Sequence, residues 1–139
     1  MKVLVAVKEV AGVDDEVEIS GLDIAGGSLE YDLNEWDDYA VEEAVQISEA
    51  NDDVEVVTVT IGPERADETV RMALAKGADR AIRVWDDALE GARFLDLGTK
   101  ADIIAAVAEA EAPDLILSGV QASDDSNGAT GVARADRRA

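Results

Sequence analysis

One segment of this sequence carries most of the small and polar residues that could bind a ligand. It runs from Gly119 to Gly131 and reads GVQASDDSNGATG. Small residues let backbone N–H groups approach an oxyanion, and the side chains of Asn127 and Thr130 can donate hydrogen bonds to a phosphate. The glycine spacing matches neither a Walker loop nor a GxGxxG fingerprint. Spacing alone therefore leaves two interpretations open: a phosphate-binding loop, or a surface loop that only caps the next helix.

Other kinds of chemistry are restricted by what the chain lacks. It contains no cysteine and no histidine, which excludes thiol nucleophiles, disulfides, histidine bases and the usual zinc sites. The run Asp124–Asn127 lacks the spaced ligands and terminal bidentate Glu of a calcium loop, so we expect no metal there. Lys8 either neutralises a nucleotide phosphate or is a solvated lysine at a strand end. We expect no catalytic residue in this chain.

Acidic residues dominate the surface that the composition predicts. The chain has 32 Asp and Glu against 12 Lys and Arg, a formal net charge of −20. Such a surface repels phosphate backbones and anionic lipids, which argues against nucleic-acid partners and membrane binding. Adaptation to a salt-rich cytoplasm explains the charge, because salt screens the repulsion; an acidic protein with a basic partner is the alternative. The first apolar run, 3–7, is too short for a signal peptide, and no membrane-length run follows, so we expect a cytoplasmic protein.

Strands and helices alternate along the chain and would position the polar loop. Helical spacing predicts helices from Asn34 to about 50, from 65 to 76 and from 100 to 111. Continuous apolar runs predict strands at 3–7, 54–61, 81–85 and 115–118. This alternation is typical of right-handed β-α-β crossovers, so the fold class is α/β, with an open parallel sheet and flanking helices.

Two local features of this scheme are less regular. Residues 17–19 and 28–31 either pair as a small hairpin or line a long excursion between the first strand and the first helix. Asn34 is expected to cap that helix by accepting a backbone N–H with its side chain, and Asp37 completes an arrangement close to a capping box. Gly77 is expected to end the second helix in the left-handed conformation.

The predicted sheet determines where a ligand would bind. In open parallel sheets, ligands lie beyond the carboxyl ends of the strands, where the strand order reverses. Three segments are expected to converge there, namely 6–8, 60–62 and 119–131.

Five segments resemble, in the same order, the β subunit of the electron-transfer flavoprotein family. Residues 34–45, NEWDDYAVEEAV, resemble the family's Asn-Pro-Phe-x-Glu-x-Ala-Val-Glu-Glu-Ala-Val. The other four segments are VLVAVK at 3–8, IGP at 61–63, ETVRMALAKGADR at 68–80 and GVQASDD at 119–125. Together they extend over nearly all of residues 1–131, with the salt-adapted composition of an archaeal-type member.

The resemblance implies a Rossmann-like domain that binds AMP and catalyses nothing alone. It also implies an α subunit as partner, which holds most of the FAD, and acyl-CoA-type or other dehydrogenases as electron donors. The AMP-contacting positions that it implies are Ala6, Asn34, Glu35, Trp36, Asp37, Ile61, Gly119, Gln121, Ala122, Asn127, Gly128, Ala129 and Thr130. Adenine and ribose would lie near Ala6, Asn34 and Ile61, and the phosphate in the turn at 128–130.

The sequence departs from the family at two points of this site and in its length. Glu35 replaces the usual proline and brings a carboxylate near the nucleotide, and Gly128 and Ala129 replace Asn and Gln, so backbone donors would contact the phosphate instead. The chain ends about halfway through the subunit that it resembles. We therefore expect a single incomplete domain over 1–139, truncated before its last strand, with an aberrant basic tail at 132–139.

Two other functions remain open. A second flavin could occupy the AMP position, as in electron-bifurcating members of the family. A stand-alone ATP- or AMP-binding stress-type domain has the same architecture, but it needs differently spaced glycines in its phosphate loop.

Overall fold

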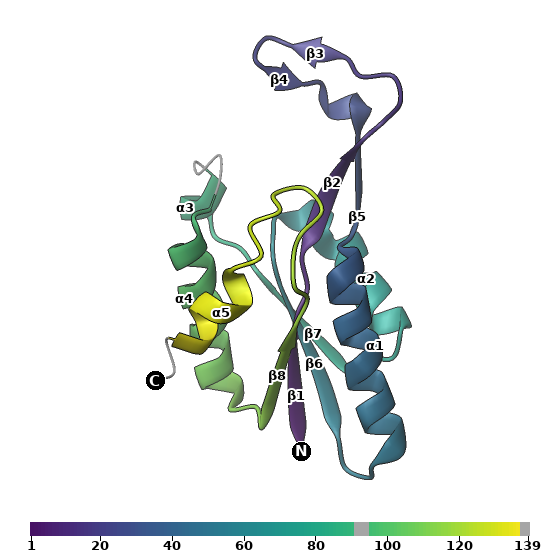
Figure 1. Ribbon diagram of the computed structural model, residues 1–139, viewed down its shortest axis with the longest axis vertical. Helices are drawn as coiled ribbons and strands as arrows, with labels where there is room; N and C mark the ends of the chain where they lie inside the picture. Colours follow the sequence, from purple (N-terminus) through teal and green to yellow (C-terminus); the bar gives the residue numbers. More distant parts are fainter. Residues whose placement is uncertain (91–94, 137–139) are drawn as a thin grey trace.

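Parallel strands form the central sheet, and the first strand lies inside it. The structure is a computed structural model that describes residues 1–90 and 95–136. In these residues the sheet has the order β7-β6-β1-β8, with every neighbouring pair parallel (Figure 1). The strands are β1 (Lys2–Ala6), β6 (Glu55–Ile61), β7 (Arg80–Val84) and β8 (Leu115–Ser118). The α/β fold with a parallel sheet is confirmed.

The sheet reverses its strand order next to β1. Leu4 pairs with Val57 of β6 on one side and with Ile116 of β8 on the other. Helices cover both faces, so the side chains of β1 are buried in either direction, and Val3 and Leu4 are fully buried. This explains why the strand is an uninterrupted apolar run. The carboxyl ends of β1 and β8 therefore flank the switch point of the fold.

Two helical layers enclose the sheet (Figure 1). Val3 and Val5 face a cluster that includes Val41 and Val45 of the first long helix, whereas Leu4 faces a cluster on the opposite side of the sheet. Ile104 and Ala108 cover Leu4 from that opposite side. The helices are α1 (Glu35–Ala50), α2 (Asp67–Ala75), α3 (Asp87–Glu90), α4 (Leu97–Glu111) and α5 (Thr130–Asp136), with 3-10 turns η1 (Gly26–Ser28) and η2 (Glu64–Ala66).

A long hairpin projects from the sheet between β1 and α1 (Figure 1). The strands β2 (Glu9–Val13) and β5 (Leu29–Leu33) pair antiparallel, and beyond them β3 (Ile19–Ser20) pairs with β4 (Asp23–Ile24). Of the two alternatives for 17–19 and 28–31, their mutual pairing is therefore wrong, and both segments lie in a long excursion between β1 and α1. Gly21, with φ of +68°, turns the chain at the tip and makes 19–20 pair with 23–24 instead.

The predicted side-chain cap of α1 is also wrong. Asn34 precedes the helix as expected, and its carbonyl accepts the N–H of Asp37 and Asp38 at 3.0 and 2.9 Å. Its side chain makes no capping hydrogen bond, because both of its polar atoms bind the loop after β8. The left-handed Gly77 after α2 is confirmed, with φ of +118°.

The third long helix begins earlier than its apolar spacing predicts. It starts at Leu97, not Lys100, because Asp96 caps it by accepting the N–H of Thr99 at 2.9 Å. Within the described residues, no helix has the length and apolar character needed to cross a membrane.

Candidate functional site

The open ends of β1 and β8 are joined by a carboxylate from the first turn of α1. Asp37 Oδ2 accepts the backbone N–H of Lys8 at 2.8 Å, and its Oδ1 accepts the N–H of Gly119 at 3.0 Å. Asp37 is buried. Burial raises the pKa of this carboxyl above its ordinary value, although the two N–H groups act in the opposite direction.

The residue before α1 holds the polar loop in place. Asn34 is 1% exposed, and its Nδ2 donates to the carbonyl of Gln121 at 2.9 Å. Its Oδ1 accepts the N–H of Ser123 at 3.3 Å. Asn34 is itself fixed, because its backbone N–H donates to the carbonyl of Lys8 at 3.0 Å. A buried amide whose hydrogen bonds are made in this way fixes one conformation of the segment that it binds.

Gly119 lies where no side chain fits. A Cβ at this position would be 2.7 Å from the carbonyl carbon of Trp36 and 2.8 Å from the backbone nitrogen of Asp37. The loop thus leaves β8 in direct contact with the start of α1. Gly131, at the other end of the loop, is similarly close to β8, because a Cβ there would be 2.7 Å from Ser118 Oγ.

Between these two glycines the loop folds back on itself. The N–H of Ser126 donates to the carbonyl of Ala122 at 2.9 Å, and the N–H of Asn127 donates to Asp125 Oδ1 at 3.2 Å. Ser126 and Gly128 have φ values of +53° and +58°. These turns make the loop compact, and we refer to the segment from Gly119 to Gly131 as the cradle.

Lysines neutralise the acidic part of the loop. Lys8 Nζ forms ion pairs with Asp124 and, at 2.9 Å, with Asp125, and Lys100 Nζ lies 3.2 Å from Asp125. Burial raises the pKa of Asp125, but hydrogen bonds from Lys8, Asn127 and Lys100 outweigh burial and hold it at about 2. Lys8 thus binds the loop's carboxylates. Across the described ranges, no cluster of three or more potential metal ligands is present.

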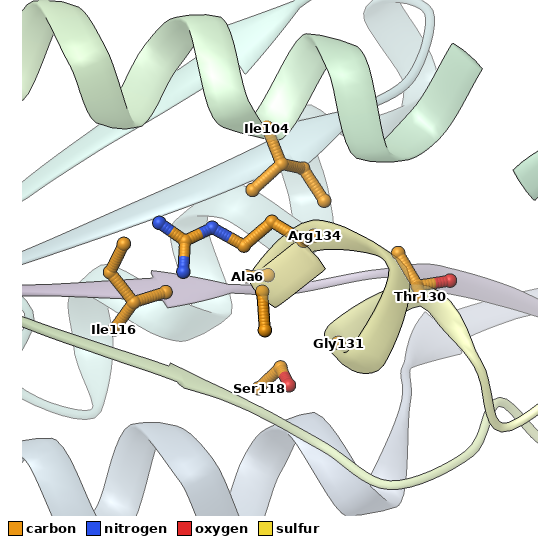
Figure 2. Close-up of a pocket in the computed structure, with 8 residues that line it drawn as sticks. Ala6, Ile104, Ile116, Ser118, Thr130, Gly131 and Arg134 are labelled. Atoms are coloured by element: carbon orange, nitrogen blue, oxygen red, sulfur yellow. The ribbon is translucent and has the colours of Figure 1, made fainter. Parts of the chain in front are cut away.

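A small pocket opens between the loop and the sheet. Its lining includes Ala6, Ile104, Ile116, Ser118, Thr130 and Gly131. Figure 2 shows that Arg134 of α5 extends across this pocket between the two isoleucines. Sequence reasoning missed Arg134. The only signal in the sequence is the change to basic composition after Gly131, which predicts an aberrant tail and not a residue of the pocket.

The expected site residues are divided between this pocket and a second hollow. Ala6 and Thr130 line the pocket, and Ile61 packs against the same apolar cluster as Ala6. Trp36 and Gly119 line the other hollow, together with Tyr39 and Val120. Gln121, Asn127 and Gly128 are exposed on the loop, and Ala122 and Ala129 are half-buried.

Trp36 is an exposed aromatic residue, not part of the core. It is 48% exposed and contacts Tyr39 edge-to-face, with ring centroids 6.0 Å apart. The Tyr39 hydroxyl donates to Glu35 Oε1 at 3.1 Å. Glu35 therefore directs its carboxylate along the helix surface toward Tyr39.

Comparison with known proteins identifies the family of this domain. Residues 22–136 match the model of the electron transfer flavoprotein domain. "Electron transfer flavoprotein subunit beta" of Methylophilus methylotrophus is 50% identical over 135 residues, which are 95% of this chain and 50% of that protein. The proteins of the same name from Bradyrhizobium diazoefficiens and Homo sapiens are 42% and 39% identical, each over 94% of this chain and 51% and 52% of their own lengths. The chain spans about half the length of the curated relatives it matches, and it belongs to the electron transfer flavoprotein domain family.

Proposed function

We propose that this chain is the nucleotide-binding part of an electron-transfer flavoprotein β subunit. The observation that carries the proposal is the loop at 119–131, which Asn34 and Asp37 hold at the switch point of a parallel sheet. This is the position at which α/β proteins bind nucleotides. The family membership and the 50% identical β subunit support the same function.

The residues of the site fit an adenine nucleotide. Ala6 leaves the end of β1 open, and Thr130 lines the same pocket (Figure 2). The absence of a side chain at Gly128 allows backbone donors of the loop to approach a phosphate. AMP in this position supplies binding energy and order, not redox chemistry. The proposed contacts are those implied by the family resemblance, namely Ala6, Asn34–Trp36, Ile61 and the loop from Gly119 to Thr130. Asp37 is excepted, because both of its carboxylate oxygens accept backbone N–H groups.

The proposed partner is an α subunit that carries FAD. Electrons from acyl-CoA-type or other dehydrogenases pass through that flavin, and this chain carries no catalytic residue of its own. The proposed complex is cytoplasmic and binds neither nucleic acid nor membranes, in keeping with the net charge of −20.

AMP titration of the 139-residue chain, followed by calorimetry, tests the nucleotide site. Asn34→Ala removes both hydrogen bonds to the loop and is expected to weaken AMP binding by about tenfold or more, because the carbonyl of Gln121 and the N–H of Ser123 lose their buried partner. The matched control is Asn51→Ala at the opposite end of α1, where the amide donates only to Ile47. Equal affinities of the two variants, or binding of FAD or FMN in preference to AMP, would contradict the proposal.

We also propose that the acidic surface adapts the chain to high salt, as in salt-adapted archaea. Carboxylates outnumber basic groups by 20, and their repulsion extends over about 10 Å at 0.1 M salt but only about 3 Å at 1 M. The midpoint of thermal unfolding should therefore rise between these two concentrations of KCl. A midpoint that stays constant or falls would exclude this adaptation.

A further inference from the structure

Asp37 occupies the point at which β1, β8 and α1 meet. Lys8 lies two residues beyond the end of β1, and Gly119 directly follows β8. Their N–H groups lie past the last paired residues of the two strands, Ala6 and Ser118. Asp37 accepts both, one with each carboxylate oxygen. A single buried side chain thus joins two neighbouring strands at the edge where the nucleotide is proposed to bind.

The close approach of the loop to Asp37 is independent evidence for this arrangement. A side chain at Gly119 would overlap the backbone of Trp36 and Asp37. The glycine therefore permits the hydrogen bond to the carboxylate, and any larger residue would displace the start of the loop from α1.

The two residues that Asp37 binds also determine the conformation of the rest of the loop. The Lys8 side chain pairs with Asp124 and Asp125 in the middle of the loop, and Gly119 is its first residue. Asn34, three residues before Asp37, binds Gln121 and Ser123, which lie between the first residue and the middle of the loop. A shift of Lys8 or Gly119 would therefore change the position of the whole cradle.

We propose that Asp37 is a positioning residue of the nucleotide site. Its carboxylate joins the ends of β1 and β8 through two hydrogen bonds, which we call the Asp37 clasp, and thereby holds the loop at 119–131 in its binding conformation. Both carboxylate oxygens are used by backbone N–H groups, so Asp37 acts through Lys8 and Gly119 and not by contact with the nucleotide. This inference rests on the proposed function, because the loop that Asp37 positions is the proposed AMP site.

Amide hydrogen exchange of the nucleotide-free chain tests the clasp without requiring that AMP binds. In the wild type, the N–H groups of Lys8 and Gly119 should exchange as slowly as those inside β1. In Asp37→Asn, these two amides and that of Ser123 should exchange at least about tenfold faster, because the amide offers one acceptor where the carboxylate offers two. Asp79→Asn is the matched control, since Asp79 accepts one strand N–H, that of Val56, at the opposite edge of the sheet.

The pattern of exchange separates a positioning role from a purely structural one. Faster exchange confined to 8 and 119–131, with AMP affinity at least about tenfold lower than in Asp79→Asn, supports the clasp. Uniformly faster exchange in Asp37→Asn would contradict the Asp37 clasp. Fast exchange of the Lys8 and Gly119 amides in the wild type would also contradict it, and this wild-type measurement is decisive even if Asp37→Asn fails to fold. If the wild type binds no AMP but the exchange change is local, the clasp of the loop stands and the nucleotide function fails.

Discussion

The two ends of the parallel sheet bind their terminal N–H groups in different ways. At the amino end, Asp114 accepts the N–H of Lys2 at 2.7 Å and Asp79 accepts that of Val56 at 2.8 Å, so each aspartate serves one strand. At the carboxyl end, Asp37 alone serves the ends of two strands. Asp114 and Asp79 each fix the end of one strand, whereas Asp37 fixes the spacing between the ends of two strands. Disturbance of Asp37 should therefore reach further than disturbance of Asp79 or Asp114.

The charged groups at the two ends of the sheet differ in burial. At the amino end, Lys2 and Arg80 pair with Glu55 and Glu111 in a network of surface ion pairs. Exposed ion pairs of this kind contribute little to stability, because water screens them and their side chains lose freedom. At the carboxyl end, the charge of Asp37 is buried. Removal of one of these ion pairs at the amino end should therefore cost little stability, whereas a change at Asp37 disturbs a buried group.

The largest effect is expected from Gly119→Ala at the carboxyl end. The new methyl group overlaps the backbone of Trp36 and Asp37, which cannot move away as a flexible side chain would. Denaturant unfolding should show a loss of about 1–3 kcal/mol, and AMP binding should be lost. Gly27→Ala is the control, because a Cβ there meets nothing within 4 Å. Equal stability of the two variants would mean that the loop does not contact α1.

A smaller effect, confined to stability, is expected from Asp79→Ala at the amino end. Val56 loses the acceptor of its N–H, which costs about 1–3 kcal/mol if the group stays buried and less if water reaches it. AMP affinity should remain that of the wild type, because β6 is held elsewhere along its length by β1 and β7. A variant that binds AMP as weakly as Asp37→Asn would remove the difference between the two ends.

The smallest effect on stability is expected from Glu111→Gln at the amino end. Its dependence on pH should be opposite to that of Asp37→Asn. Hydrogen bonds from Arg80 and Lys2 lower the pKa of Glu111 from 4.5 to about 2. Its stabilising contribution is therefore complete above about pH 4.5 and is lost as the pH falls toward 2. Burial raises the pKa of Asp37, so the folded state takes up that proton first, and the wild type should gain stability relative to Asp37→Asn as the pH falls toward 3.8.

Denaturant unfolding of the wild type and both variants across this pH range measures the two contributions. As the pH falls, the free energy of unfolding of the wild type should approach that of Glu111→Gln. Over the same range, the wild type should become more stable relative to Asp37→Asn. Parallel changes in the two differences would show that the ends of the sheet do not differ in burial.

The strands and long helices could be predicted from the sequence because each depends on a pattern within one segment. The run at 3–7 is apolar throughout, since helices cover both faces of β1, and the spacing of Val41 and Val45 reflects the face that α1 buries. The hairpin could not be predicted, because strands as short as 19–20 and 23–24 show no period. Its pairing depends on the turn at Gly21.

The candidate site could be predicted in its location but not in its contacts. Parallel topology brings the ends of β1 and β8 together, so the position of the loop follows from the order of the elements. The partners of Asn34 and Asp37 lie more than 80 residues away at Gln121 and Gly119. Local rules assign both side chains to the helix cap, since a capping pattern contains no information on a distant loop that competes for the same atoms.

The position of β1 also has a consequence for how the protein is made. β1 is synthesised before both of the segments with which it pairs, which begin at Glu55 and Leu115. One of its edges therefore stays unpaired until nearly all of the described chain has been made. Contacts of such long sequence separation form slowly, and exposed strand edges promote association with other chains. During translation, α1 is the first helix that can cover Val3 and Val5, whereas Leu4 stays uncovered until α4 has been made.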